Sequence, residues 1–166
     1  EKFYEKGEKF ALIKNTEGKY FTFEEYRKFI EPAQKDKDGK LIFLYASSLE
    51  DQHSFIATAR DKGYDVILMD GILDNHFINT LEQKLEKVQI KRVDSETADK
   101  LIDKDEKMES VLSTEEQEQV KAVFEKAIGN KNMAVAVESL SPSDLPVVIT
   151  MSEFMRRMKD MAKMGG

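Results

Sequence analysis

The first part of the chain places apolar residues at helical spacing between polar turns. Apolar positions within residues 2–13 predict a first helix, and the turn-forming residues 15–18 are expected to end it. Thr22 and Glu25 then form the pattern of a capping box, in which a hydroxyl and a carboxylate cap the same helix start. A second helix is therefore predicted to begin here, and we expect it to end before Pro32.

Three apolar runs, separated by two helical patterns, follow in the next fifty residues. Residues 41–45 and 66–69 are continuously apolar, which indicates strands buried on both faces. Residues 88–93 alternate, so this third strand is expected nearer an edge. The intervening helices are expected to end at Gly63 and to span residues 72–85. This order predicts right-handed crossovers and a parallel sheet with helices on its faces.

Composition changes after the third strand. Residues 94–119 contain ten acidic residues against three lysines, and few apolar ones. We interpret the middle of this stretch, residues 99–112, as an acidic junction between two units. The predicted fold class is α/β plus α+β. A small three-layer α/β unit with a parallel sheet spans residues 1–98, and a small α+β module spans residues 113–166.

The second unit is predicted to contain a helix, two strands and a final helix. Ser113 or Thr114 is placed to cap the first helix, which Gly129 is expected to end. Apolar residues in 133–140 and 145–150 predict two strands, and the short turn between them favours an antiparallel pair. The unit then ends in an amphipathic, methionine-rich helix.

This last helix has an unusual composition, because residues 151–166 hold five of the eight methionines. On a helix, the apolar side chains share an arc of roughly 120°, with charged side chains opposite. The residues of this arc are Met151, Phe154, Met155, Met158 and Met161. Methionine adapts to many apolar shapes, whereas cores prefer branched residues. The arc is therefore either a core or partner-helix face, which composition alone slightly favours, or an adaptable binding face.

The overall charge limits the classes of partner. A net charge of −6 and a pI near 5.1 give no attraction toward nucleic acid or anionic membrane, since phosphate binding needs clustered Lys and Arg. No apolar run is long enough to cross a bilayer. The absence of cysteine excludes disulfides and thiolate chemistry, and it is typical of the cytoplasm. The abrupt ends of the chain suggest that it is a piece of a longer protein.

Catalytic chemistry has weak support in the sequence. Asp70 follows a buried strand, the position where ligands bind in open α/β sheets, and this favours a receiver-like or metal-dependent domain as an alternative. However, the first strand is followed by no carboxylate, and one acid cannot hold Mg²⁺. Asp70 and Asp74 are expected to cap the next helix. His53 and His76 share no motif with each other, and no Gly-rich phosphate loop exists. We therefore predict no catalytic residues, no metal site and no ATP binding.

Five segments in order resemble the bacterial members of the heat shock protein 90 chaperone family. They are FTFEEY (21–26), LIFLY (41–45), KGYDVILMD (62–70), DNHFINTL (74–81) and LPVVITMSEFMRRM (145–158). Each is weak alone, but together they extend over almost the whole chain. The sequence departs from the family at Phe29 and Ile30, where Arg-Met is more usual, and in a longer loop at 35–39.

The resemblance implies a segment of an ATP-dependent chaperone. Residues 1–98 would be the distal α/β part of the middle domain, and residues 113–166 the first part of the C-terminal domain. The nucleotide and its Mg²⁺ would bind an absent N-terminal domain, so this chain would need no cofactor. The dimerisation helices would follow Gly166, so this chain should form at most a weak dimer, whereas the longer chaperone is a homodimer.

The resemblance also bears on the methionine-rich helix, which in this family contacts unfolded or partly folded client proteins. The client-binding residues would be Phe154, Met155, Met158 and Met161. We expect these side chains to be more exposed than their hydrophobicity suggests.

Overall fold

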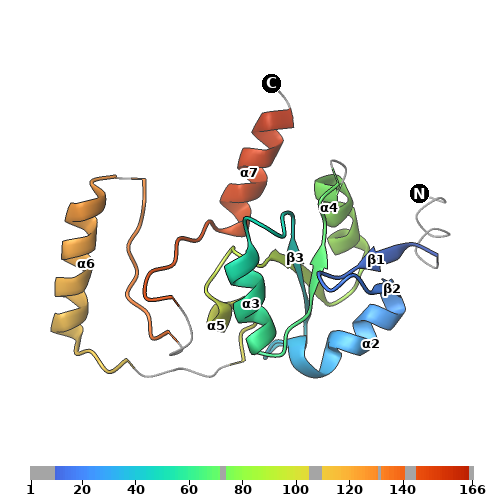
Figure 1. Cartoon of the computed structure of the whole chain (residues 1–166), viewed down its shortest axis with the longest axis horizontal. Helices are drawn as coiled ribbons and strands as arrows, with labels where there is room; N and C mark the ends of the chain where they lie inside the picture. Colours follow the sequence, from blue (N-terminus) through green and yellow to red (C-terminus); the bar gives the residue numbers. More distant parts are fainter. Residues whose placement is uncertain (1–9, 72–73, 105–109, 131, 141–144, 165–166) are drawn as a thin grey trace. The chain divides into compact units, whose positions relative to one another are not determined.

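The computed structural model describes residues 10–71, 74–104, 110–130, 132–140 and 145–164 (Figure 1). The side chains of residues 75, 76, 79, 160, 161, 163 and 164, among them those of His76 and Met161, lie outside this description. The chain forms two compact units. The first contains residues 1–105 and 147–166, and the second contains residues 106–146.

A three-stranded parallel sheet forms the centre of the first unit. Strand β3 (Leu41–Ala46) lies between β4 (Val66–Leu68) and β5 (Val88–Arg92). Leu44 pairs with Val66 on one side, and Phe43 pairs with Ile90 on the other. All six residues of β3 are buried, as expected for a strand covered on both faces. The predicted parallel sheet is confirmed, with β5 at an edge.

Helices cover both faces of this sheet and make three layers (Figure 1). Because side chains alternate along a strand, Phe43 of β3 faces one layer and Leu44 the other. The first layer contains α2 (Phe23–Gln34) and α4 (Asp74–Lys84). The second contains α3 (His53–Asp61) and α5 (Ala98–Leu101).

Helix α5 overlaps the start of the segment interpreted as an acidic junction, residues 99–112, and belongs to the first compact unit. Leu101 and the following Ile102 are both 1% exposed in the second core layer. Two adjacent apolar side chains are enough to anchor this short helix, even though its surroundings in the sequence are acidic.

A two-stranded antiparallel hairpin replaces the end of the first predicted helix. Strand β1 (Leu12–Lys14) pairs with β2 (Tyr20–Thr22), so a helix extending to residue 13 was wrong; residues 1–9 lie outside the described residues. Buried Asn15 organises the turn, because its Oδ1 accepts the amides of Glu17 and Lys19 at 3.1 and 2.9 Å. Its Nδ2 donates to Asp65 at 2.8 Å, which ties the hairpin to the residues before β4.

Helix α2 begins as predicted and ends later than predicted. The Thr22–Glu25 capping box is formed, with Glu25 accepting the Thr22 amide at 2.8 Å. The helix continues through Pro32 to Gln34, since a proline in the last turn removes one amide without stopping the chain from completing that turn. Gln34 is buried and donates to the Ile42 carbonyl at 2.8 Å, which holds the end of α2 on the sheet.

The second unit contains α6 (Thr114–Ile128). Its predicted caps are confirmed, with a capping box at Ser113 and Gly129 in the left-handed conformation at φ 59°. None of its residues is buried. The strands predicted at 133–140 and 145–150 are absent from those segments. The stability of a two-stranded hairpin is marginal unless one of its faces packs against an apolar surface, and the exposed helix α6 provides no such packing.

Helix α7 (Glu153–Met164) belongs to the first compact unit. From its order in the sequence, this helix was expected in the unit of residues 113–166. In the structure its first turn contacts the ends of β3 and β5 through polar side chains. This contact is the physical reason for the difference.

Candidate functional site

Helix α7 exposes most of the apolar side that the sequence singles out. Phe154 is 70% exposed, Met155 60% and Met158 50%. Met151, just before the helix, is also exposed. Met161 is the fourth predicted client-binding residue, and its side chain lies outside the described residues. The three described residues are therefore exposed, as expected, and together form an apolar surface.

The opposite side of α7 is charged and faces the protein. Arg156 is only 3% exposed, and its guanidinium lies 5.3 Å from the centre of the Tyr45 ring. Glu153 accepts hydrogen bonds from Arg156 and, at 2.9 Å, from Arg157 Nε. Residues at i, i+3 and i+4 share one side of a helix, so all three side chains reach the same surface.

These charged side chains join α7 to α4 and β5. Arg157 Nη1 donates to Glu82 Oε2 of α4 at 2.6 Å. Glu153 Oε2 accepts the Arg92 amide of β5 at 3.2 Å, and Glu153 Oε1 accepts the Tyr45 hydroxyl at 3.3 Å. Burial alone would raise the pKa of Glu153, but hydrogen bonds from Arg156 and Arg157 outweigh it and lower that pKa. Glu153 is therefore ionised at neutral pH.

The arrangement inverts the usual orientation of an amphipathic helix. Such a helix normally places its apolar stripe on the core and its charged side in water. Here the charged side is docked and the apolar side is free. Sequence reasoning identified the apolar side but missed the docking role of Glu153, Arg156 and Arg157. The available signal was the placement of an acid three and four residues before two arginines.

The alternative site at Asp70 gains nothing from the structure. Asp70 is exposed. Asp74 accepts the Gly71 amide at 2.8 Å, which is the helix-start role expected for it. His53 is exposed on α3, and the His76 side chain lies outside the described residues. Within the part of the chain that the structure describes, His, Asp and Glu side chains form no group of three suited to a metal ion.

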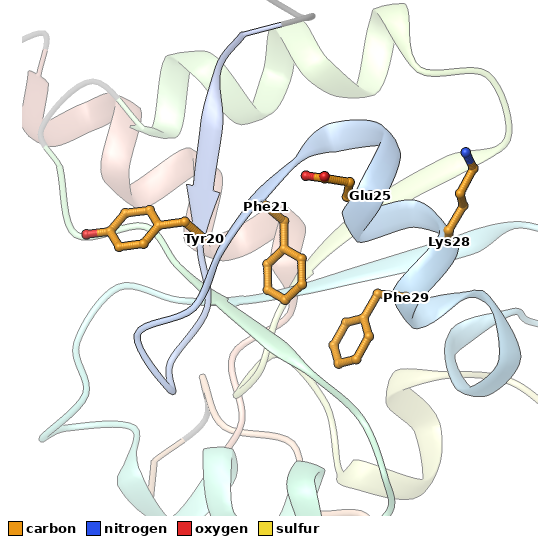
Figure 2. A pocket seen from close by; sticks show the side chains of 5 residues that line it. All are labelled: Tyr20, Phe21, Glu25, Lys28 and Phe29. Carbon is orange, nitrogen blue, oxygen red and sulfur yellow. The ribbon is translucent and has the colours of Figure 1, made fainter.

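A second apolar surface lies between β2 and α2, which sequence reasoning did not predict. Figure 2 shows Phe21 and Phe29 with their rings close together, and their centroids lie 5.2 Å apart in a stacked arrangement. Tyr20 is 62% exposed and Phe29 51%. With Glu25 and Lys28 they line an open hollow of about 570 Å³. Phe29 and Ile30 are adjacent apolar residues, and helical spacing alone does not separate the exposed ring from the buried side chain.

The described helices include none with both the length and the apolar character needed to cross a membrane.

Comparison with known proteins finds relatives of the same name in several bacteria. No family model matches the chain. The chain is 47% identical over 165 residues to the chaperone protein HtpG of Bacteroides fragilis (strain YCH46). It is 46% identical to the HtpG chaperones of Bacteroides thetaiotaomicron, over 165 residues, and Porphyromonas gingivalis (strain ATCC 33277), over 167 residues. These matches cover 98–99% of the chain.

The same matches cover only 24% of each relative, so the chain spans about a quarter of the length of the curated proteins that it matches. Identity at this level over nearly the whole chain confirms the resemblance that the five sequence segments indicated. The chain therefore corresponds to one segment of the bacterial heat shock protein 90 chaperones, the HtpG proteins.

Proposed function

We propose that this chain is a segment of an ATP-dependent molecular chaperone that contributes contact with client proteins and coupling between domains, with no catalysis of its own. We call the surface formed by Phe154, Met155 and Met158 on α7 the client surface. The spacing of Met161 in the sequence places it on the same side of this helix. The observation that carries the proposal is the exposure of these apolar side chains on a helix whose charged side is docked.

The chemistry of this surface suits unfolded clients. An unfolded chain presents apolar side chains of many shapes, and burying apolar area contributes about 25 cal/mol per Å². Unbranched methionines can adjust to those shapes, whereas branched side chains hold one shape. An aromatic ring at Phe154 adds a large, rigid contact area. The surface should therefore bind many sequences with modest affinity.

The remaining parts of the proposal extend the family resemblance and concern the longer protein. The longer chaperone would bind ATP and Mg²⁺ and form the homodimer, in the cytoplasm, while this chain alone would bind no nucleotide and form at most a weak dimer. Stable interfaces commonly need about 800 Å² from each partner. Saturable ATP binding by calorimetry, or a dimer that survives dilution below micromolar concentration in sedimentation, would contradict these parts.

The client surface can be tested by replacing its apolar side chains with a charge. Phe154→Asp and Met158→Asp should each weaken binding of fluorescent, carboxymethylated α-lactalbumin, a permanently unfolded protein, by roughly tenfold. Leu12→Asp is the matched control, since Leu12 is 62% exposed on β1. Each variant should keep its stability within about 1 kcal/mol, because the changed side chain is exposed.

Two results would contradict the client surface. One is unchanged binding in both α7 variants, and the other is an equal loss in Leu12→Asp. The measurement is then repeated in the full-length chaperone. A loss in the isolated chain that disappears in the full-length protein would show that other parts of the chaperone cover this side of α7.

A further inference from the structure

Strand β5 is an edge strand whose outer main-chain groups are bound by side chains. Its ladder partner is β3. On the other side, the Ile90 amide donates to Glu82 Oε1 at 2.8 Å, and the Ile90 carbonyl accepts from Arg157 Nη2 at 3.2 Å. The next outward amide, that of Arg92, donates to Glu153 at 3.2 Å. Edge groups normally bond to water or to another strand. Here α4 and α7 supply their partners.

The side chains that bind this edge also bind one another. Glu82 and Glu153 both accept from Arg157, and Glu153 also accepts from Arg156. Two acids and two arginines balance in charge. The side chains of Glu82, Glu153 and Arg157 are between 19% and 25% exposed, so water only partly screens these pairs. The group therefore has more geometric specificity than ordinary surface ion pairs.

We propose that Glu82, Glu153, Arg156 and Arg157 form a polar latch that fixes the rotation of α7, with Glu153 as its central positioning residue. Glu153 is the one carboxylate among the described residues that contacts both arginines, the Tyr45 hydroxyl and the Arg92 amide. This inference rests on the proposed function for its biological meaning, because the latch decides whether the client surface faces solvent.

The latch works against the hydrophobic effect. Rotating α7 toward the protein would bury Phe154 and Met158 and would be favoured by their apolar area. The same rotation would break the charge-assisted bonds and leave Arg156, the Arg92 amide and the Ile90 carbonyl without these partners. Loss of the Glu153 carboxylate should therefore release α7 and let its apolar side turn away from solvent.

The rotation of α7 can be measured without any client. The chain has no cysteine, so spin labels can be placed at Asp61→Cys on α3 and Lys159→Cys on α7 without background labelling. In the otherwise unchanged chain, the latch predicts one narrow distance distribution. Glu153→Ala should shift or broaden it, and Glu153→Gln should do so less, because the amide oxygen can still accept. Glu116→Gln on α6, which removes a helix-capping carboxylate elsewhere, should leave it unchanged.

Amide exchange gives a second readout on the sheet itself. In Glu153→Ala the Arg92 amide should exchange faster by about tenfold, as expected for losing one charge-assisted hydrogen bond, while the Phe43 amide in β3 keeps its protection. Unchanged label distances and an unchanged Arg92 amide in both Glu153 variants would overturn the latch. A broadened distance with an unchanged Arg92 amide would also overturn it, since α7 would then be frayed rather than released.

The outcomes separate the latch from the client surface. Phe154→Asp should weaken client binding while the label distance stays the same. Glu153→Ala should change the label distance whether or not α7 binds clients. If the distance changes but Phe154→Asp leaves binding unchanged, the latch stands and the proposed function fails.

Discussion

Helices α2 and α7 are both twelve residues long, both amphipathic and both in the first unit, yet they dock with opposite sides. Helix α2 buries Phe23, Tyr26 and Ile30. Helix α7 buries Arg156 and exposes Phe154. Amphipathicity thus shows that a helix has two sides without showing which one faces inward. The partner surface decides this, and α2 meets the apolar face of β3, whereas α7 meets the polar edge of β5.

The largest effect expected from this comparison concerns apolar truncation in each helix. Ile30 is 2% exposed, so Ile30→Ala should lower the free energy of unfolding by about 2–5 kcal/mol through lost burial and a cavity. Met158 is 50% exposed, so Met158→Ala should change it by less than about 1 kcal/mol. Urea denaturation followed by circular dichroism measures both. Equal losses would mean that the apolar side of α7 is buried in solution.

A smaller effect on the docking of α7 should appear when acid removes the charge of Glu153 in the first turn of that helix. The folded-state pKa of Glu153 lies below its ordinary value, so the native state holds fewer protons than the unfolded state near that pKa. The contribution of Glu153 to docking is therefore present above pH about 4.5 and is lost as the pH falls through the lowered pKa. Glu82, Arg156, Arg157 and Tyr45 face it, and the arginines stay charged throughout this range.

The matching measurement follows amide exchange in α7 as the pH is lowered. Protection of α7 amides should fall while that of β3 amides persists, and Glu153→Gln should remove most of this pH dependence. Glu25 on α2 provides the contrast. Its pKa is lowered by hydrogen bonds from Thr22, but α2 is also held by its buried aromatic residues. Parallel loss of protection in α2 and α7 would show that acid unfolds the unit as a whole.

The sheet could be predicted because its signal is local. Continuous apolar runs such as that of β3 fit a strand covered on both faces, and the spacing between runs leaves room for crossover helices. The prediction of the first helix failed because its sequence signal was ambiguous. Short apolar patterns near residue 13 fit helix and strand alike. The bonds that Asn15 accepts within the turn are local, but its bond to Asp65, which holds the hairpin beside β4, joins residues fifty positions apart.

The candidate site could be predicted only in part. The apolar side of α7 is visible in the sequence, because methionines recur at helical spacing. Its orientation is not visible, because it depends on Arg157 meeting Glu82, seventy-five residues earlier in the chain. The exposed ring of Phe29 raises the same difficulty, since it stacks on Phe21 from another element. Long-range pairs of this kind leave no periodic pattern.

The smallest expected effect separates the two helices at their first turns. The Thr22 hydroxyl accepts the Glu25 amide at 3.3 Å, and the Glu25 carboxylate accepts the Thr22 amide at 2.8 Å, so α2 has a reciprocal cap. The Ser152 hydroxyl accepts the Met155 amide at a longer 3.4 Å, and the methionine side chain has no carboxylate to accept the Ser152 amide. Thr22→Ala should therefore cost about 1 kcal/mol, and Ser152→Ala only a few tenths.

The two cap substitutions should also change different measurements, the urea midpoint in one case and amide exchange in the other. Because α2 is part of the core, Thr22→Ala should shift the urea midpoint of the whole unit. Helix α7 is held by Glu153, Arg156 and Arg157, so Ser152→Ala should mainly speed exchange of the Met155 amide and leave the midpoint in place. If Ser152→Ala shifted the midpoint as much as Thr22→Ala, capping rather than the polar latch would hold α7. The inverted orientation of α7 would then need another cause.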